Sequence, residues 1–191
     1  MGAVVPARQP EGYEEPMSEL HDDPVGRQRL SFQRSTDDDG AETVLVECWV
    51  DPGGGVPPHI HPTFTEVFEV FEGEMTFTAG RRKEVRCAGE SITVPPGTRH
   101  AYANKGSTTV HMRCIAKPPL DLEEFLVTTA RLGREGHIAR LGPLRGPGSL
   151  SGLPKVAGML RRHRENTIVL SPPPILQKLV FDRIAERAGE A

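Results

Sequence analysis

The sequence predicts an all-β domain, either an antiparallel sandwich or a barrel, followed by a helical C-terminal segment. From Arg27 to Pro118, short apolar runs alternate with turn clusters such as Asp51-Pro-Gly-Gly-Gly55, which is typical of short antiparallel strands. From Asp121 onward the apolar residues recur at helical spacing. The 18 prolines and 20 glycines supply the many turns that such a fold needs.

Three segments follow from these patterns. Residues 1–25 are polar, acidic and proline-bearing without periodicity, so we expect a flexible N-terminal arm. A chain that starts near Pro24 should then still fold. Residues 26–118 form the β-domain, and residues 119–191 form the helical extension.

Within the extension, Asp121 and Glu124 have the spacing of a capping box, which predicts a helix that ends near Gly133. The Gly/Pro/Ser-rich stretch 140–154 is expected to be a connector, and a second helix is expected over 155–164.

A third helix should begin after Pro172-Pro-Pro174, because proline suits a first helical turn. It would carry an apolar stripe that must be buried against the barrel or a partner subunit. The stripe consists of Leu176, Leu179, Val180 and Ile184.

The pair His59 and His61 is the strongest sign of chemistry in the β-domain. Side chains at i and i+2 of a strand point to one face, so the two histidines project together. Glu66 lies an odd number of positions from His61, so a bend is needed, and Pro62 stands where it would fall. Glu66 then begins a strand over 66–71.

On that strand, Glu66 shares one face with Phe68 and Val70. A carboxylate on an apolar face is either paired or bound to a cation. His100 follows the turn Pro95-Pro-Gly97 and begins another short strand. Two histidines, a carboxylate and a third histidine can together surround one divalent metal.

These residues resemble the two signature motifs of the cupin superfamily. The first motif is Gly, five residues, His-x-His, three or four residues, Glu, six residues, Gly. The second is Gly, five residues, Pro-x-Gly, two residues, His, three residues, Asn. All fixed places of both are filled, by Gly53, His59, His61, Glu66 and Gly73, and by Gly89, Pro95, Gly97, His100 and Asn104. The resemblance covers about residues 26–118.

The resemblance implies a double-stranded β-helix, the cupin or jelly-roll barrel, with the helical extension behind it. It also implies one divalent transition metal held by His59, His61, Glu66 and His100. Such a set leaves two positions of an octahedron open for a substrate or water. Nitrogen and oxygen donors suit Fe, Mn, Ni, Co or Zn alike, so the identity of the metal stays open.

For other residues the sequence predicts a role less specifically. Tyr102 shares the phase of His100, so it could face the metal or fill the core, and we name Glu66 and Tyr102 as candidate catalytic residues. Phe64, Phe68, Val70 and Met112 are candidates for a pocket wall, although core packing is the stronger expectation for each. Asn104 and the motif glycines should be structural, and Arg99 should lie at the surface. The remaining histidines should be exposed to solvent: His21, His111, His137 and His163.

Three functional classes fit a metal-binding cupin. The leading one is a metal-dependent small-molecule oxidoreductase of dioxygenase type. The alternatives are a non-redox metalloenzyme (an isomerase, lyase or cyclase) and a non-catalytic module that binds a metal or a small ligand. Because a fold does not determine a function, the sequence leaves all three open.

Composition excludes some partners. A net charge of −3 gives no basic patch for binding nucleic acid, and no apolar run approaches the ~20 residues of a membrane helix.

We expect no secretory signal, because the N-terminus lacks a basic segment followed by an apolar core. The three cysteines are expected to be buried free thiols, as is usual in a reducing compartment: Cys48, Cys87 and Cys114. We therefore expect a cytoplasmic protein that binds a small-molecule substrate. The apolar stripe of the third helix favours a homodimer.

Overall fold

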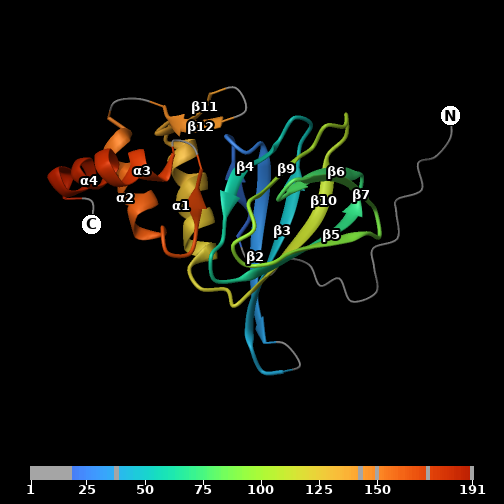
Figure 1. Cartoon of the computed structure of the whole chain (residues 1–191). Helices are drawn as coiled ribbons and strands as arrows, with labels where there is room; N and C mark the ends of the chain where they lie inside the picture. The colour runs from blue at the N-terminus through green and yellow to red at the C-terminus, as the bar shows by residue number, and fades with distance from the viewer. Residues whose placement is uncertain (1–18, 37–38, 142–143, 149–150, 171–172, 190–191) are drawn as a thin grey trace.

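The computed structural model describes residues 19–36, 39–141, 144–148, 151–170 and 173–189. Two antiparallel sheets face each other and form a barrel, and the helices gather at one end of it (Figure 1). The fold is therefore mostly β with C-terminal helices, as the sequence predicts. No helix in these ranges is long and apolar enough to cross a membrane.

Strands from distant parts of the chain alternate in both sheets. In the described residues the larger sheet has the order β1(His21–Asp23), β2(Gln28–Thr36), β3(Glu42–Val50), β10(Val110–Lys117), β5(Thr65–Glu72), β8(Ser91–Val94). The smaller sheet has the order β13(Ile168–Val169), β4(Gly55–Ile60), β9(His100–Ala103), β6(Glu74–Ala79), β7(Arg82–Cys87).

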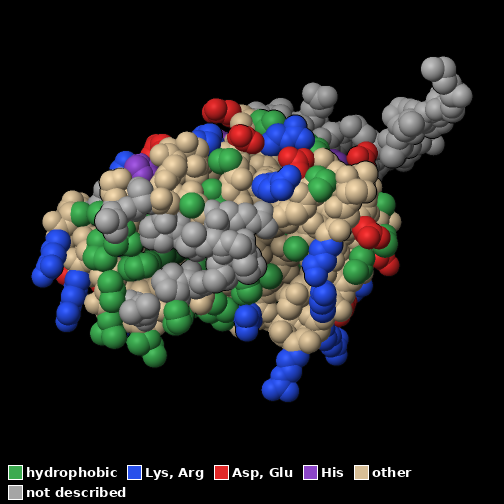
Figure 2. All heavy atoms as spheres, turned by 90° about the horizontal axis from the view of Figure 1, so that it is seen from above, with side chains coloured by type: hydrophobic (Ala, Val, Ile, Leu, Met, Phe, Trp, Pro, Cys, Tyr) green, Lys and Arg blue, Asp and Glu red, His purple; other side chains and the backbone are tan. Residues whose placement is uncertain are grey.

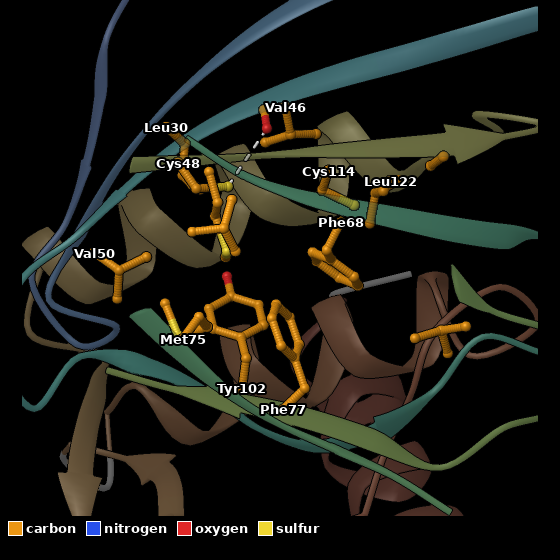
Figure 3. Close-up of a cluster of buried hydrophobic side chains, with 14 of the residues drawn as sticks. Leu30, Val46, Cys48, Val50, Phe68, Met75, Phe77, Tyr102, Cys114 and Leu122 are labelled. Carbon is orange, nitrogen blue, oxygen red and sulfur yellow. Dashed lines mark hydrogen bonds between the residues drawn. The ribbon is translucent and has the colours of Figure 1, made fainter. Parts of the chain in front are cut away.

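The core lies between the two sheets and is built from alternating residues of each strand. In β5, Glu66, Phe68 and Val70 are buried while their neighbours are half-buried, so the predicted phase of this strand is confirmed. Figure 3 shows the rings of Phe68, Phe77 and Tyr102 side by side in this core. Their centroids are 5.2–6.2 Å apart.

The end of the predicted N-terminal arm pairs with the sheet. Residues 1–18 of the predicted arm lie outside the described residues, but its last residues form β1, which pairs with β2. The Asp23 carboxylate accepts hydrogen bonds from the backbone of Gly26 and the side chain of Gln28, and Arg134 donates to the carbonyl of Asp22. These contacts hold residues 21–23, the last part of the predicted arm, in the sheet.

The extension starts with the predicted helix, α1(Leu122–Arg134). The capping box is wrong: Asp121 makes no side-chain cap hydrogen bond, and its carboxylate instead accepts a hydrogen bond from Nδ1 of His163 at 2.7 Å. The expected connector contains a hairpin, β11(Ile138–Leu141) with β12(Leu144–Pro147). The second helix, α2(Leu153–Arg162), begins two residues before its predicted start at residue 155.

The C-terminal helix turns a different face inward from the one we expected. It consists of α3(Pro174–Leu176), a π-helical segment η1(Gln177–Phe181) and α4(Asp182–Ala188). Phe181 and Ala185 are buried, whereas Leu179 is 58% exposed and Val180 39% exposed. The side chain of Leu176 lies outside the described residues. Ile184 of the predicted stripe is half-buried and packs against the same cluster as Phe181 and Ala185, so the inward face holds only part of the stripe.

Candidate metal centre

The two cupin-like motifs bring four side chains together inside the barrel. His59 lies in β4 and His61 just after it, Glu66 lies in β5, and His100 begins β9. His59 pairs directly with His100 across β4 and β9. All four residues are buried, and one possible ligand atom from each lies within 4.8 Å of the others. The sequence-predicted ligand set is thus one cluster.

Each histidine is oriented by a hydrogen bond from its outer ring nitrogen. Nδ1 contacts the carbonyl oxygen of Pro57 for His59 (2.9 Å), of Asn166 for His61 (3.0 Å) and of Thr98 for His100 (2.9 Å). A carbonyl only accepts, so Nδ1 must carry the proton. Nε2 of a neutral ring then keeps its lone pair, as a metal ligand requires.

Glu66 and His100 show why a cation fits here. Oε2 of Glu66 lies 2.7 Å from Nε2 of His100. Among the described residues, however, neither atom has a partner with hydrogen-bond geometry. Two buried polar atoms that approach without bonding are costly unless a third group satisfies both. A divalent cation would do so, and the His₃Glu donor set suits a transition metal.

Burial and charge set the protonation of the cluster. Burial lowers the pKa of His59 well below its usual value, and the neighbouring His100 and His61 add to the effect. Burial also lowers the pKa of His61, against the opposing charge of Glu66. For Glu66, burial acts to raise the pKa, but the contact with His100 and the charge of His61 outweigh it and lower the pKa to about 2. Neutral imidazole and ionised carboxylate are the forms that bind metal.

Two neighbours support the cluster. The Cys114 thiol donates to Oε1 of Glu66 at 3.5 Å, and burial raises the pKa of this thiol well above its usual value, so it remains a donor. Phe64 stacks on the His61 ring with centroids 4.2 Å apart. Both contacts restrict the ligands' rotamers.

The extension also reaches the cluster. The Thr167 hydroxyl oxygen lies 3.2 Å from Nδ1 of His61, next to the Asn166 carbonyl that accepts from the same nitrogen. β13 pairs with β4 so that Val169 lies opposite His59. Sequence reasoning missed these contacts, because residues 140–170 carry no motif that signals them.

Three members of the cluster, His59, His61 and Glu66, line a cavity of about 100 Å³ between the barrel and the helices. Tyr102 and Phe68 line it and also belong to the core, whereas Phe64, Val70 and Met112 are core residues outside its lining. The Tyr102 hydroxyl donates to Oε1 of Gln28 at 2.8 Å. A catalytic role for Tyr102 or Glu66 stays a prediction.

Two of the histidines expected at the surface are buried. His111 stacks on Trp49 with centroids 4.9 Å apart and bonds to the Glu47 carboxylate at 2.8 Å. His163 is 1% exposed and bonds to Asp121. Paired carboxylates make both burials favourable, and no local pattern signals partners so distant in sequence. One cysteine prediction is also wrong, because Cys87 is exposed while Cys48 and Cys114 are buried and free.

Comparison with known families agrees with this geometry. Residues 46–116 match the family model described as the cupin domain. The chain therefore contains a domain of the cupin superfamily. The matched residues of this cupin include all four members of the metal-site cluster.

Similar proteins share the central part of this cupin. Germin-like protein 3-5 of Oryza sativa is 43% identical over 70 residues, which cover 32% of this chain and 30% of that protein. Oxalate oxidase 1 of Hordeum vulgare is 38% identical over 69 residues, which cover 32% of this chain and 34% of that enzyme. The chain thus spans about a third of these plant relatives.

Two further matches come from microbes. An uncharacterized protein of Methanocaldococcus jannaschii is 29% identical over 85 residues, which cover 44% of this cupin and 68% of that protein. The solved structure of KdgF from Halomonas sp. has a TM-score of 0.50 at 16% identity, and the match covers 58% of this chain and 97% of that one. At such low identity this likeness shows the fold.

Proposed function

We propose that this cupin is a metal-dependent oxidoreductase of dioxygenase type that acts on a small organic molecule. The observation that carries the proposal is the convergence of His59, His61, Glu66 and His100 in one buried cluster, from which His59, His61 and Glu66 line a cavity. Four protein ligands would leave part of the coordination sphere of one divalent transition metal to a substrate.

Each group of residues around the cavity would have its own role in the reaction. The three histidines and Glu66 would hold the metal, which when bound supplies Lewis acidity and, if redox-active, electron transfer with oxygen. The apolar walls would keep bulk water away from the reacting atoms. Glu66 would accept a proton from a substrate hydroxyl, and Tyr102 would turn its hydroxyl from Gln28 toward the substrate.

The ionisable groups around the cavity favour oxidation over proton shuttling. Apart from the proposed ligands, the described lining residues with titratable groups are Cys48, Cys114 and Tyr102. Burial raises the pKa of both thiols strongly, so neither thiol is a base near pH 7. An isomerase or lyase usually needs a further acid–base residue. The relatives named as oxalate oxidases also support oxidation.

The test is metal analysis of the purified protein followed by oxygen uptake with catechols and enols. The proposal expects about one Fe, Mn, Ni or Co per chain and uptake that depends on the organic substrate. A His61→Ala variant supplies the matched control for uptake by stray metal.

Stoichiometric zinc without oxygen uptake would contradict the dioxygenase and favour a non-redox metalloenzyme. Tight binding of metal or small ligands with no turnover of any kind would favour the non-catalytic binding module.

A further inference from the structure

We infer that the C-terminal extension makes the pocket selective for an uncharged, largely apolar molecule. A small oxygen-bearing head would lie at the metal, and the apolar body would lie against helices α1 and α2. This inference rests on the proposed metal centre, and it assigns the class of molecule that the centre takes.

The first argument is the composition of the wall opposite the cluster. The extension contributes Phe125 from α1, Val156, Met159 and Leu160 from α2, and Phe181 from η1. These side chains are buried and belong to one hydrophobic cluster. The barrel adds Leu30, Val46 and Phe68 on its own side. A ligand in this space gains affinity by burying apolar surface.

The second argument is charge. Among the described residues that line the cavity, Glu66 is the only acidic side chain, and none is Lys or Arg. A ligand with a carboxylate or phosphate on its body would lose its hydration in this space and find no cation on the wall to compensate. The lining therefore disfavours anionic bodies such as sugar phosphates.

The third argument is that the threonine hydroxyl groups of the wall are already engaged. Thr129 donates to the Phe125 carbonyl at 2.8 Å, and Thr167 contacts Nδ1 of His61. A sugar-like ligand with many hydroxyls would leave them unsatisfied against this wall, and unsatisfied buried polar groups are costly. The wall consequently selects against polyhydroxylated molecules as well.

Three chelators with the same head group test the inference on the Co(II)-loaded full chain. Acetohydroxamate, benzohydroxamate and succinic monohydroxamate carry a methyl, a phenyl and a carboxylate-bearing body. Binding is followed by the visible Co(II) spectrum, and each affinity is corrected for that of free Co(II). We expect benzohydroxamate to bind at least tenfold more tightly than either of the other two.

Variants assign the preference to the extension. Met159→Gln keeps the side-chain length but adds a polar amide, and it should reduce the preference for phenyl over methyl at least threefold. Phe181→Leu is a second, milder variant and should reduce it in the same direction. Arg162→Gln lies on the exposed face of α2 and should leave the preference unchanged.

The outcomes separate this inference from the proposed function. If the chain does not bind Co(II), the metal centre itself is wrong. If Co(II) binds but the phenyl and methyl probes bind equally, or the carboxylate probe binds most tightly, the metal centre stands and the apolar selectivity is overturned.

Discussion

The hydroxyl oxygen of Thr167 lies 3.2 Å from Nδ1 of His61, although the two residues are 106 positions apart in the chain. Both side chains are buried. The same ring nitrogen contacts the carbonyl of Asn166 at 3.0 Å. A hydrogen bond at the outer ring nitrogen of a histidine fixes which nitrogen faces the metal. The C-terminal extension therefore orients His61, a proposed metal ligand of the barrel.

Thr167→Val should therefore weaken metal binding while the protein stays folded. The variant keeps the volume of the side chain but removes the hydroxyl, and loss of such a partner costs about 10-fold to 100-fold in metal affinity. The Asn166 carbonyl remains, so we expect the lower end of this range. Competition titration of Co(II) or Zn(II) measures the change.

Thr167→Ser should restore the affinity. Thr129→Val is a matched control, because Thr129 is also buried in the extension but its hydroxyl contacts Phe125 and Met159 and no proposed ligand. Equal losses in Thr167→Val and Thr129→Val would mean that the effect is one of packing.

Two truncations test the N-terminal boundary. A chain that starts at residue 19 keeps β1 and should fold with nearly unchanged stability. A chain that starts at Pro24 removes β1 and Asp23, whose carboxylate bonds to Gly26 and Gln28. It should lose about 1–3 kcal/mol of unfolding free energy, because those buried donors lose their acceptor. Urea denaturation of both chains distinguishes them, and equal midpoints would show that β1 is dispensable.

The pair Arg164–Asp182 should make stability depend on acid pH. The hydrogen bond with Arg164 lowers the pKa of Asp182, and the guanidinium contacts both carboxylate oxygens. The resulting stability is present above the unfolded pKa of about 3.9 and is lost as the pH falls through the lower folded value. Because the pair is partly exposed, it contributes no more than about 1 kcal/mol.

Asp182→Asn should therefore lower the unfolding free energy at pH 7 and have little further effect at pH 2. Thermal or urea denaturation at the two pH values provides the measurement. An equal loss at both would show that the charge of Asp182 does not matter.

We also predict a homodimer formed through the C-terminal helix. Ile175 is 77% exposed and Leu179 58% exposed, and hydrophobic side chains gather at the helical end in Figure 2. A second copy of the chain would cover this apolar surface.

Sedimentation should give twice the monomer mass at micromolar concentration. The double variant Ile175→Gln/Leu179→Gln should sediment with the monomer mass. Val85 is an exposed residue of β7, so the control variant Val85→Gln should keep the dimer mass. A monomeric wild type would refute the prediction.

The site was predictable where the chemistry is local. His59 and His61 share a strand face by simple alternation, and Glu66 stands out as a carboxylate in phase with Phe68 and Val70. The turns that deliver His100 are marked by proline and glycine. Strand phase and turn chemistry act over a few residues, so they can be read from the sequence.

The rest depends on contacts between distant segments. The bonds Asp121–His163 and Glu47–His111 bury polar groups that look exposed in isolation. Phe181 and Ala185 of the last helix are buried, while Leu179 of the predicted stripe is exposed. The contact between Thr167 and His61 needs β13 to pair with β4. None of these has a periodic signature, because each is set by tertiary packing.

Metal stoichiometry of the wild type and of the double variant His61→Ala/His100→Ala tests the central claim most directly. The wild type should hold about one divalent transition metal per chain, and the folded double variant should hold none. Glu66→Gln should bind metal more weakly than wild type but better than the double variant, because three histidines remain. A double variant that folds and still binds one transition metal tightly would contradict the account.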